Sequence, residues 1–546
     1  MKKIVLLMLI AVLGIASNAQ NTINETQKLA TLCKVWGFLK YYHPKVAKGI
    51  YDWDVELIKK IPQIKSTKTK EEINKIYVEW IDGLGKVKKR NIKTDTVGLF
   101  TNNFDLMWIS DTSLFSENVI NKLTFIRDNR ASKQKYYVKE TSTSPSFSKE
   151  RIYSEMKLPA VEYRLLGLAR YWNIVNYYYP YKYLLKNWNN VLPDFVSKFI
   201  NANDTLTYHL AIMELSAKIT DSHTSFSSEY TNNYFGNYYP PIKYRMIDNK
   251  IVVFGFWNDS LAKINDIKKG DVIVAYDNIK MKDYIDSYKK YMGASNEPTQ
   301  LMHIKALLLF NKKDSVCITY ERDGNIFKKD IKLYEFSDFK IKKGENQLGY
   351  KDLSGDVGYL DLNNLSLKNI DYVMKKMLNK KAIIFDIRNG SHQTLYSIAN
   401  YLNKDRKQFA QFYVQDFSMP GQFRFQNKAY CGKYSNQGYY RGKVIVLVNE
   451  YTICHGEFTC MALQTAPDVK VIGSQTAGTD GNASTIFFPG GNSLIMTGIG
   501  VCYPDGRETQ RIGIIPDIEV KPTIEGLKLG KDEVLERAIE YINTGK

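Results

Sequence analysis

The chain of 546 residues contains few cysteines and, beyond its first residues, no long apolar run. Six cysteines are too few to form the disulfide framework of a small secreted domain, although an oxidising compartment would permit individual bridges. After residue 19 no run approaches the ~20 apolar residues that a membrane span requires. We therefore expect no integral membrane segment in the mature chain.

The first residues depart from this pattern. Residues 1–3 include two lysines, residues 4–16 carry no charge, and Ser17-Asn18-Ala19 supplies a cleavage site. This order of regions is typical of a secretory signal peptide, so we expect residues 1–19 to be removed. The mature protein should then be soluble and exported, to the periplasm or outside the cell.

The chain also lacks a recognisable nucleic-acid-binding motif, despite a net charge of +19. A basic surface binds phosphates by releasing counterions, but here the lysines are spread over every segment. The clusters at residues 86–90 and 375–381 are short. Dispersed charge is typical of a solvated surface. We expect no nucleic-acid partner, and the sequence indicates no metal site or cofactor.

Aromatic residues are plentiful and occur in two similar helical patterns. Residues 32–44 match residues 168–180, with a tryptophan, a tyrosine pair and a final proline in the same register. Proline ends each pattern because it cannot continue a helix without losing a hydrogen bond. We predict two copies of one helical unit, one within residues 20–145 and one over residues 150–235. Residues 91–145 are polar and irregular, which suits a linker or a small strand-rich insert.

Residues 443–484 read as a buried strand, a sharp turn, a helix, a second strand and a glycine-bearing loop. Residues 444–448 are a continuous β-branched and leucine run, typical of a parallel strand buried on both faces, and residues 457–464 have helical spacing. Cys454 lies at the joint between them. A nucleophile held there is exposed at the sheet edge, and the positive end of the following helix favours an anion.

The second helical unit ends in a turn that the first one lacks. Ser222-His223 follows a helical pattern there, whereas the first unit reads Leu84-Gly85. A histidine at a helix end is usually structural, so His223 alone does not indicate a site. The other histidines are of two kinds, three inside helical patterns and two in predicted active-site loops that make them rivals of His223 (His43, His209 and His303; His392 and His455).

Residues 240–336 resemble a PDZ-like β domain. The resemblance rests on residues 260–277, a helix and turn followed by a Gly270-Asp271-x-Ile strand, and on a late strand at residues 316–322. Such domains bind a peptide end by adding it as a strand to a sheet edge. A Gly-Leu-Gly-Phe carboxylate-binding loop is not evident here, and an unrelated small β domain is the alternative.

The motifs of the C-terminal half resemble those of the tail-specific (C-terminal processing) and tricorn-core serine peptidases. In chain order they are a Ser-His turn, an Asp-x-Arg strand and loop, Asn-Glu-x(3)-nucleophile-x-x-Glu, Val-Ile-Gly, Thr-x-Gly and Gly-Ile-x-Pro-Asp-Ile (residues 222–223, 386–390, 449–457, 471–473, 476–478 and 513–518). In that family the nucleophile is a serine, and here the position is Cys454. The bacterial tail-specific branch places a lysine base near Thr479, whereas the tricorn-like branch uses histidine.

This resemblance implies acyl-transfer chemistry. Cys454 would be the nucleophile and His223 its base. The backbone N–H of His455 and that of Asn389 or Gly390 would hold the oxyanion.

The imidazole also needs a group that orients it. Ser222 is one candidate and Glu508 is another, because the tricorn-like branch relays from histidine through a serine to a C-terminal glutamate. Gln510 lies close to Glu508 in sequence. The plain alternative for Glu508 is a solvated side chain in a turn.

A cysteine at position 454 leaves three hypotheses. It is a working nucleophile, since a thiol beside histidine at a helix N-terminus can have its pKa lowered from ~8.5 toward neutrality. Alternatively, turnover has been lost and the protein binds peptides as a scaffold. The third reading is a small buried apolar residue. We expect an exported peptidase that acts on peptides or unfolded proteins, with the inactive scaffold as the alternative.

The expected architecture is a multidomain α+β chain. A helical repeat region precedes the PDZ-like domain at residues 240–336, and strands alternate with helices over residues 345–546. The resemblance implies that this last α/β domain has the crotonase/ClpP-like catalytic fold.

Overall fold

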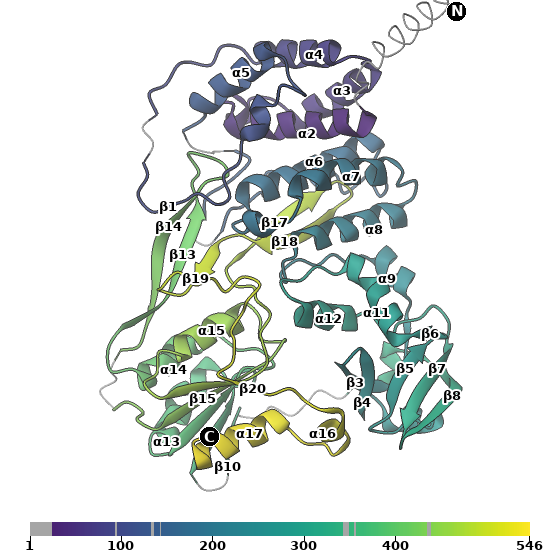
Figure 1. Cartoon of the computed structure of the whole chain (residues 1–546), viewed down its shortest axis with the longest axis vertical. Coiled ribbons are helices and arrows are strands. Elements are labelled where there is room, and N and C mark those ends of the chain that lie inside the picture. The colour runs from purple at the N-terminus through teal and green to yellow at the C-terminus, as the bar shows by residue number, and fades with distance from the viewer. Residues whose placement is uncertain are drawn as a thin grey trace, which may run out of the picture.

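The computed structural model describes residues 24–92, 95–132, 136–141, 144–341, 349–353, 356–433 and 438–546. The signal peptide expected at residues 1–19 lies outside the described residues. Figure 1 shows a helical N-terminal region, a β domain and a C-terminal α/β region, which confirms the expected multidomain mixture of helices and sheets. Within the described ranges no helix is both long enough and apolar enough to cross a membrane.

The two aromatic repeats form equivalent sets of helices that pack side by side (Figure 1). Each set has a long helix, a short 3-10 turn and two further helices: α2 (Glu25–Tyr42), η1 (Val46–Lys48), α3 (Trp53–Ser66) and α4 (Lys70–Gly83), then α6 (Val161–Tyr178), η3 (Lys182–Leu184), α7 (Trp188–Ile200) and α8 (Thr205–Ser216). The sets also share one hydrogen bond. The indole N–H of Trp36 donates to the carbonyl of Trp53 (2.8 Å), and that of Trp172 donates to the carbonyl of Trp188 (3.2 Å).

Helices α2 and α6 approach closely because a glycine on one faces an asparagine on the other. The amide of Asn173 donates to the carbonyl of Cys33 (2.9 Å), and a Cβ on Gly37 would lie only 1.9 Å from the Asn173 side chain. Two buried cations, Lys40 on α2 and Arg170 on α6, pair with the same buried Glu150. Since a buried charge is tolerated only when it is paired, this cluster fixes how the two repeats meet.

The segment between the repeats is more ordered than its polar sequence predicted. Helix α5 (Glu117–Asp128) and the turn η2 (Met107–Ser110) lie within residues expected to be irregular, and β1 (Leu99–Phe100) pairs with a strand of the C-terminal region. The buried side chains of α5 are three and four residues apart (Val119, Leu123 and Ile126). This helical spacing is the signal that the polar composition concealed.

The β domain is an antiparallel sheet in the order β3-β4-β5-β7-β8, with β6 beside β5. Its strands and helices are β3 (Ile242–Ile247), β4 (Lys250–Phe256), α10 (Asp259–Ile264), β5 (Val272–Tyr276), β6 (Ile279–Lys280), α11 (Met281–Tyr288), α12 (Glu297–Lys305), β7 (Ser315–Arg322) and β8 (Asn325–Lys332). Gly270 turns into β5 with φ 89°, as expected. Phe235, at the end of α9 (Glu229–Phe235), stacks on Tyr288 at 5.3 Å, so the apolar core continues into the helical region.

The C-terminal region is built on a six-stranded sheet in the order β10-β11-β12-β15-β16-β20, in which only β10 is antiparallel to its neighbour. Its elements are β10 (Tyr350–Leu353), β11 (Val357–Asp361), α13 (Ile370–Met377), β12 (Ala382–Asp386), α14 (Leu395–Leu402), β15 (Lys443–Val448), α15 (His455–Leu463), β16 (Val469–Gly473), β20 (Ile518–Glu519), α16 (Ile524–Lys528) and α17 (Glu533–Thr544). One apolar core joins α13, α14 and α15 to one face, and α17 packs on the other. Cys454 and the Asn389-Gly390 loop follow neighbouring parallel strands and so share one edge.

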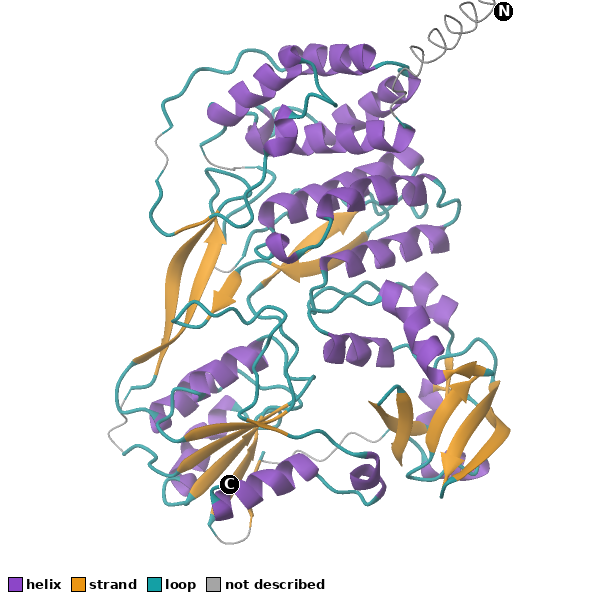
Figure 2. Cartoon of the chain, viewed as in Figure 1, coloured by secondary structure: helices purple, strands orange, loops and turns teal. Residues whose placement is uncertain are grey.

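Two further pieces of β structure connect this sheet to the helical repeats (Figure 2). One joins β13 (Lys407–Gln415), β14 (Phe423–Cys431) and β19 (Gly500–Cys502), and the other is the hairpin of β17 (Ala483–Phe488) and β18 (Asn492–Thr497). The hairpin packs against α6, and the hydroxyl of Tyr208 on α8 donates to the carbonyl of Pro489 at its tip (3.0 Å). This contact brings the end of the second repeat toward the sheet edge that carries Cys454.

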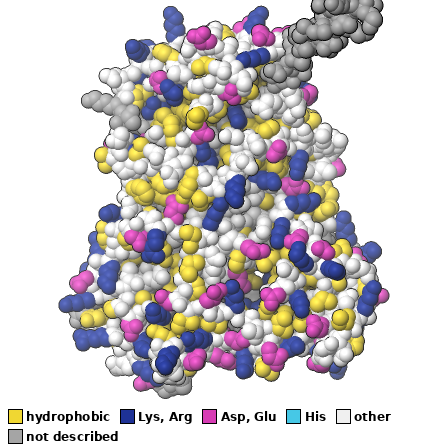
Figure 3. All heavy atoms as spheres, viewed as in Figure 1, with side chains coloured by type: hydrophobic (Ala, Val, Ile, Leu, Met, Phe, Trp, Pro, Cys, Tyr) yellow, Lys and Arg dark blue, Asp and Glu magenta, His cyan; other side chains and the backbone are white. Residues whose placement is uncertain are grey.

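Charged side chains are dispersed on the face of the molecule shown in Figure 3. Lysines and arginines are scattered over all three regions there, with acidic side chains among them. This face has the solvated, mixed character that the sequence predicted.

Candidate active site

Cys454 occupies a sharp turn between β15 and α15. Its backbone has φ 51° and ψ −110°, a conformation that side-chain-bearing residues rarely adopt. Strain of this kind costs of order 1–3 kcal/mol and persists only where the surroundings impose it. Here the N–H of Cys454 donates to the carbonyl of Thr479 (3.0 Å), while the hydroxyl of Thr452 holds the start of the turn to the carbonyl of Ile387 (3.1 Å).

The surroundings of the Cys454 thiol favour its protonated form. Burial, followed by the negative charge of Asp480, raises the pKa of Cys454 to about 12, and the backbone N–H of His455 opposes this increase only in part. Reactive cysteines usually have a lowered pKa. The thiol therefore resembles a serine hydroxyl in one respect, because it requires a base before it can attack.

His223 lies just beyond α8, after the 3-10 turn η4 (Ala217–Ile219). Its Nδ1 is 2.7 Å from the hydroxyl of Thr497 on β18, and that hydroxyl is 3.0 Å from Oδ1 of the fully buried Asp221. Because a hydroxyl has only one proton, Thr497 can donate to Asp221 and accept from Nδ1–H. This arrangement leaves the lone pair of His223 on Nε2, the nitrogen that a general base needs.

The protonation state of His223 suits the same role. Burial lowers its pKa, and the carboxylate of Asp221, 3.9 Å from Nδ1, opposes that decrease. The imidazole is therefore neutral at pH 7 and able to accept a proton.

The structure brings Cys454 and His223 to the same loop but does not join them directly. Thr479 contacts both residues. Its backbone carbonyl accepts from the N–H of Cys454, and its side-chain hydroxyl lies 3.5 Å from Nδ1 of His223. Within the described ranges no hydrogen bond links the thiol to the imidazole. The thiol instead faces the carbonyl of Gly481 at 3.9 Å.

The two predicted orienting groups lie elsewhere. The hydroxyl of Ser222 donates to the carbonyl of Ala477 (3.0 Å), so it points away from its neighbour His223. Glu508 accepts hydrogen bonds from Tyr183 and Tyr413. Among the described contacts, neither side chain reaches the imidazole.

The groups that do contact or face His223 were missed in the sequence. Asp221 stands two residues before His223 and was therefore within the recognised turn. Thr497, in contrast, is 274 residues away along the chain. Asp221 also accepts from the N–H of Thr497 (2.7 Å) and from the hydroxyl of Thr479 (2.7 Å), so one carboxylate organises three segments.

The predicted oxyanion donors differ in whether their N–H groups are free to bind an oxyanion at Cys454. The N–H of His455 points toward the sulfur of Cys454, as its effect on the thiol pKa shows. The N–H of Gly390 already donates to the carbonyl of Ile387 (3.2 Å), so Asn389 is the better of the two donors proposed for that loop. The loop itself lies against α15, since the hydroxyls of Ser391 and Thr459 are 3.1 Å apart.

The rival histidines also lie at this edge. Nε2 of His455 is 3.2 Å from the carbonyl of His392. His455 lines the cavity at Cys454, which places a second imidazole beside the thiol.

Two buried carboxyl groups flank the turn. Glu457, fully buried on α15, accepts from Thr476, from the N–H groups of Gly478 (2.8 Å) and Thr479 (3.0 Å), and from the N–H of Cys454 (3.3 Å). Burial nevertheless raises its pKa to about 8. Burial also raises the pKa of Asp480 to about 7, and Oδ2 of Asp480 has no hydrogen-bond partner among the described residues.

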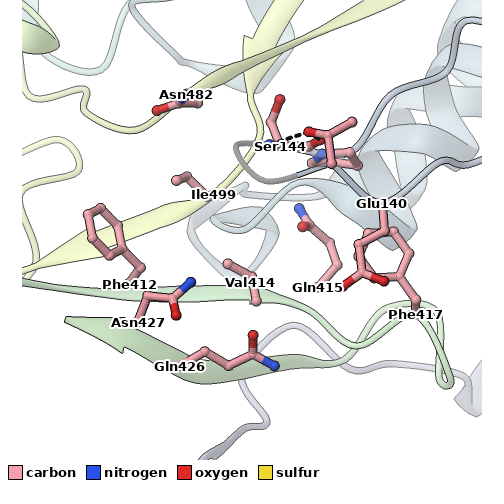
Figure 4. Close-up of a pocket in the computed structure, with 12 residues that line it drawn as sticks. Glu140, Ser144, Phe412, Val414, Gln415, Phe417, Gln426, Asn427, Asn482 and Ile499 are labelled. Carbon is pink, nitrogen blue, oxygen red and sulfur yellow. Dashed lines mark hydrogen bonds between the residues drawn. The ribbon is translucent and has the colours of Figure 1, made fainter. Parts of the chain in front are cut away.

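Cys454 opens onto a cavity of about 450 Å³ with aromatic walls (Tyr396, Phe412 and Phe458), which also includes Asp480 and Asn482. A second cavity of about 340 Å³ shares Phe412 and Asn482 with the first. Figure 4 shows this second cavity, where Phe412, Val414 and Gln415 of β13 and two residues of β14 lie opposite Asn482 and Ile499. In the part of the chain described, neither cavity is lined by a lysine or an arginine.

A thiol on a strand-to-helix turn, beside a cavity and in contact with the same loop as a histidine, is compatible with the chemistry of hydrolases that act through an acyl-enzyme. Residues 356–520 match the sequence profile of peptidase family S41, a range that includes Cys454, His455 and the Asn389-Gly390 loop. This part of the chain is therefore similar to peptidase family S41, in agreement with the resemblance that the motifs predicted.

Solved structures of mature CPAF share the fold at low sequence identity. Mature CPAF in complex with lactacystin superposes with a TM-score of 0.56 and 12% identity over 71% of this chain and 99% of that chain. Mature CPAF alone gives a TM-score of 0.56 and 13% sequence identity over the same shares of the two chains. A putative peptidase from Parabacteroides merdae ATCC 43184 gives a TM-score of 0.44 and 17% sequence identity over 70% of this chain and 97% of that chain. The CPAF likeness shows a common fold; no curated protein matches the sequence.

Proposed function

We propose that this protein is an exported peptidase that cleaves peptide bonds through an acyl-enzyme on Cys454, with His223 as the base. The observation that carries the proposal is the strained turn of Cys454. It holds a thiol at the start of a helix, beside a cavity, in a domain of a peptidase family. The pattern of residues 1–19 supports export.

In the proposed reaction Nε2 of His223 takes the proton of the Cys454 thiol as the sulfur attacks the carbonyl carbon. The N–H of His455, at the positive end of α15, would stabilise the oxyanion. The imidazolium, supported by Thr497 and Asp221, then returns the proton to the leaving amine. Water hydrolyses the thioester with the same base. Catalytic hydrogen bonds are often long without substrate and tighten in the complex, so we expect the thiol and the imidazole to approach each other when substrate binds.

The adjoining cavities support a peptide as the substrate. The cavity at Cys454 can receive an apolar or aromatic side chain, since Phe412, Phe458 and Tyr396 form its walls. The cavity of Figure 4 continues from it past Phe412 and Asn482, and would receive the next part of the chain. We further propose that the β domain is PDZ-like, with the edge strand β3 open to an added strand.

A peptide-binding scaffold without turnover is the second candidate. The raised pKa of Cys454 and the lack of a direct bond from its thiol to His223, within the described residues, favour it. The cavities and the edge strand would serve binding equally well.

Iodoacetamide labelling of Cys454, located by peptide mass spectrometry, tests the proposal. A working site predicts labelling that slows by about tenfold or more in His223→Gln, because the glutamine cannot accept the thiol proton. His455→Gln tests the rival base and should leave the rate unchanged. Labelling that is equally slow in wild type and His223→Gln, together with no turnover of unfolded proteins, would move the conclusion to the scaffold.

A further inference from the structure

Helix α12 belongs to the β domain by sequence, but both of its ends are bonded to the candidate active site. Figure 1 shows it between the helical repeats and the parallel sheet. It is nine residues long, so it spans roughly 14 Å at 1.5 Å per residue. A short regular helix of this kind transmits a displacement at one end to the other, because its backbone bonds resist stretching.

The N-terminal end of α12 holds the turn that carries His223. Ser222 and Ser295 exchange two hydrogen bonds: the N–H of Ser222 donates to the hydroxyl of Ser295 (3.1 Å), and the N–H of Ser295 donates to the hydroxyl of Ser222 (2.8 Å). The next residue, Asn296, caps the helix through Thr299 and donates its amide to the carbonyl of Thr476 (2.7 Å). This end therefore grips both the histidine turn and the loop that leads to Thr479.

The C-terminal end holds the turn that carries Cys454. The ammonium of Lys305 donates to the hydroxyl of Tyr451 (2.9 Å) and lies 5.4 Å from the centres of the Tyr451 and Tyr244 rings. Tyr451 stands three residues before Cys454, between β15 and the strained backbone. The ion pairs of the described residues include none with Lys305, and its ammonium is bonded to the tyrosine hydroxyl.

This attachment crosses a void. A cavity of about 450 Å³ lies between β3 and α12 and reaches the C-terminal region, with Lys305 and Tyr451 both in its wall. The Lys305–Tyr451 hydrogen bond joins the two sides of this cavity. Because close packing is incomplete around it, we expect this bond to help set the spacing of α12 and the turn of Cys454.

We propose that Ser295 and Lys305 are positioning residues, which use α12 as a spacer to set the separation of His223 and Cys454. The inference rests on the proposed function, since it concerns the same thiol and imidazole. Neither residue touches the reacting atoms. Loss of either contact would leave both groups present but misaligned, and small misplacements cost about 100-fold in rate.

A double-mutant cycle on thiol labelling tests this directly. The ratio of Cys454 labelling rates between the His223 enzyme and His223→Gln is measured in the wild type, in Lys305→Met and in Ser295→Ala. Met keeps the apolar stem of lysine but cannot donate. We expect the ratio to fall from about tenfold to about onefold to threefold in each variant, and to recover in part in Lys305→Arg, which can still donate to Tyr451.

Matched controls separate positioning from a general loss of structure. Lys312→Met removes a lysine that lies 4.9 Å from the ring of Tyr234, and Ser287→Ala removes an exposed hydroxyl bonded to Tyr284; both should keep the full ratio. Labelling of Cys317, the other half-buried cysteine, should be unchanged throughout.

The outcomes distinguish the two proposals. A wild-type ratio near one would overturn the histidine–cysteine pair, and with it this inference. A high ratio in wild type that persists in Lys305→Met and Ser295→Ala would overturn the positioning role alone. A change in Cys317 labelling that matches the change at Cys454 would also overturn it, because the variants would then act through general unfolding.

Discussion

Asp221→Asn should slow peptide turnover by about 100- to 1,000-fold. The Asp221 carboxylate lies 3.9 Å from Nδ1 of His223. At an effective dielectric constant of 20, opposite charges at this separation attract by about 4 kcal/mol. Losing most of that support for the imidazolium corresponds to roughly three factors of ten, since each 1.36 kcal/mol is tenfold.

The hydrogen-bond pattern adds a second effect of Asp221→Asn. The carboxylate accepts from the hydroxyl of Thr497, which leaves that hydroxyl to accept from Nδ1–H. An asparagine amide can donate to the hydroxyl instead, so Thr497 can then donate to Nδ1. The proton of His223 would move to Nε2, and the base would lose its lone pair at the atom facing the substrate.

The pH dependence of activity tests this role of Asp221. The base works when neutral, so activity rises with pH through the pKa of His223, which burial lowers and Asp221 raises. Removing the Asp221 charge should therefore move the acid limb to lower pH while the plateau falls. Asp271→Asn, at a buried carboxylate bonded to Arg322 in the β domain, controls for the cost of the substitution itself. An acid limb that moves to higher pH, or a plateau equal to wild type, would refute the role of Asp221.

Three other outcomes are expected. Cys454→Ser should retain or raise peptide turnover and Cys454→Ala should abolish it, because the thiol already depends on a base as a hydroxyl does; equal turnover by wild type and Cys454→Ala would exclude this nucleophile. In the folded protein the pKa of Glu457 is about 8, against an ordinary 4.5, so the stability that this carboxyl group contributes is full below pH 4.5 and is lost as pH rises through 8. The melting temperature of wild type should therefore exceed that of Glu457→Gln most at low pH. A difference in melting temperature that widens as pH rises would contradict this. Phe412→Ala, at the wall shared by both cavities, should raise KM for peptides with aromatic or branched side chains severalfold, and KM values that stay the same for all peptides would remove these cavities from the substrate path.

Local sequence patterns predicted much of the framework. The buried run before Cys454 became β15, and the helical spacing after it became α15. The aromatic repeat became two helix sets with the same indole-to-carbonyl bond. These features depend on neighbours within about twenty residues, so periodicity and proline placement suffice to indicate them. Helix α5 was missed because charged and polar side chains masked its three buried positions.

The details around the imidazole depend on contacts that no local pattern encodes. Thr497 reaches His223 only because the β17–β18 hairpin packs against α6, and α12 reaches Ser222 and Tyr451 only because the β domain folds back between two other regions. A family resemblance suggested Ser222 and Glu508 as orienting groups, but the structure bonds Ser222 to Ala477 and Ser295, and Glu508 to two tyrosines. A relay of hydroxyl and carboxylate is present, through Thr497 to Asp221. The presence of a hydroxyl and a carboxylate beside the imidazole could therefore be predicted, because a base must be oriented. The identity of the two residues could not, because tertiary packing brings them there.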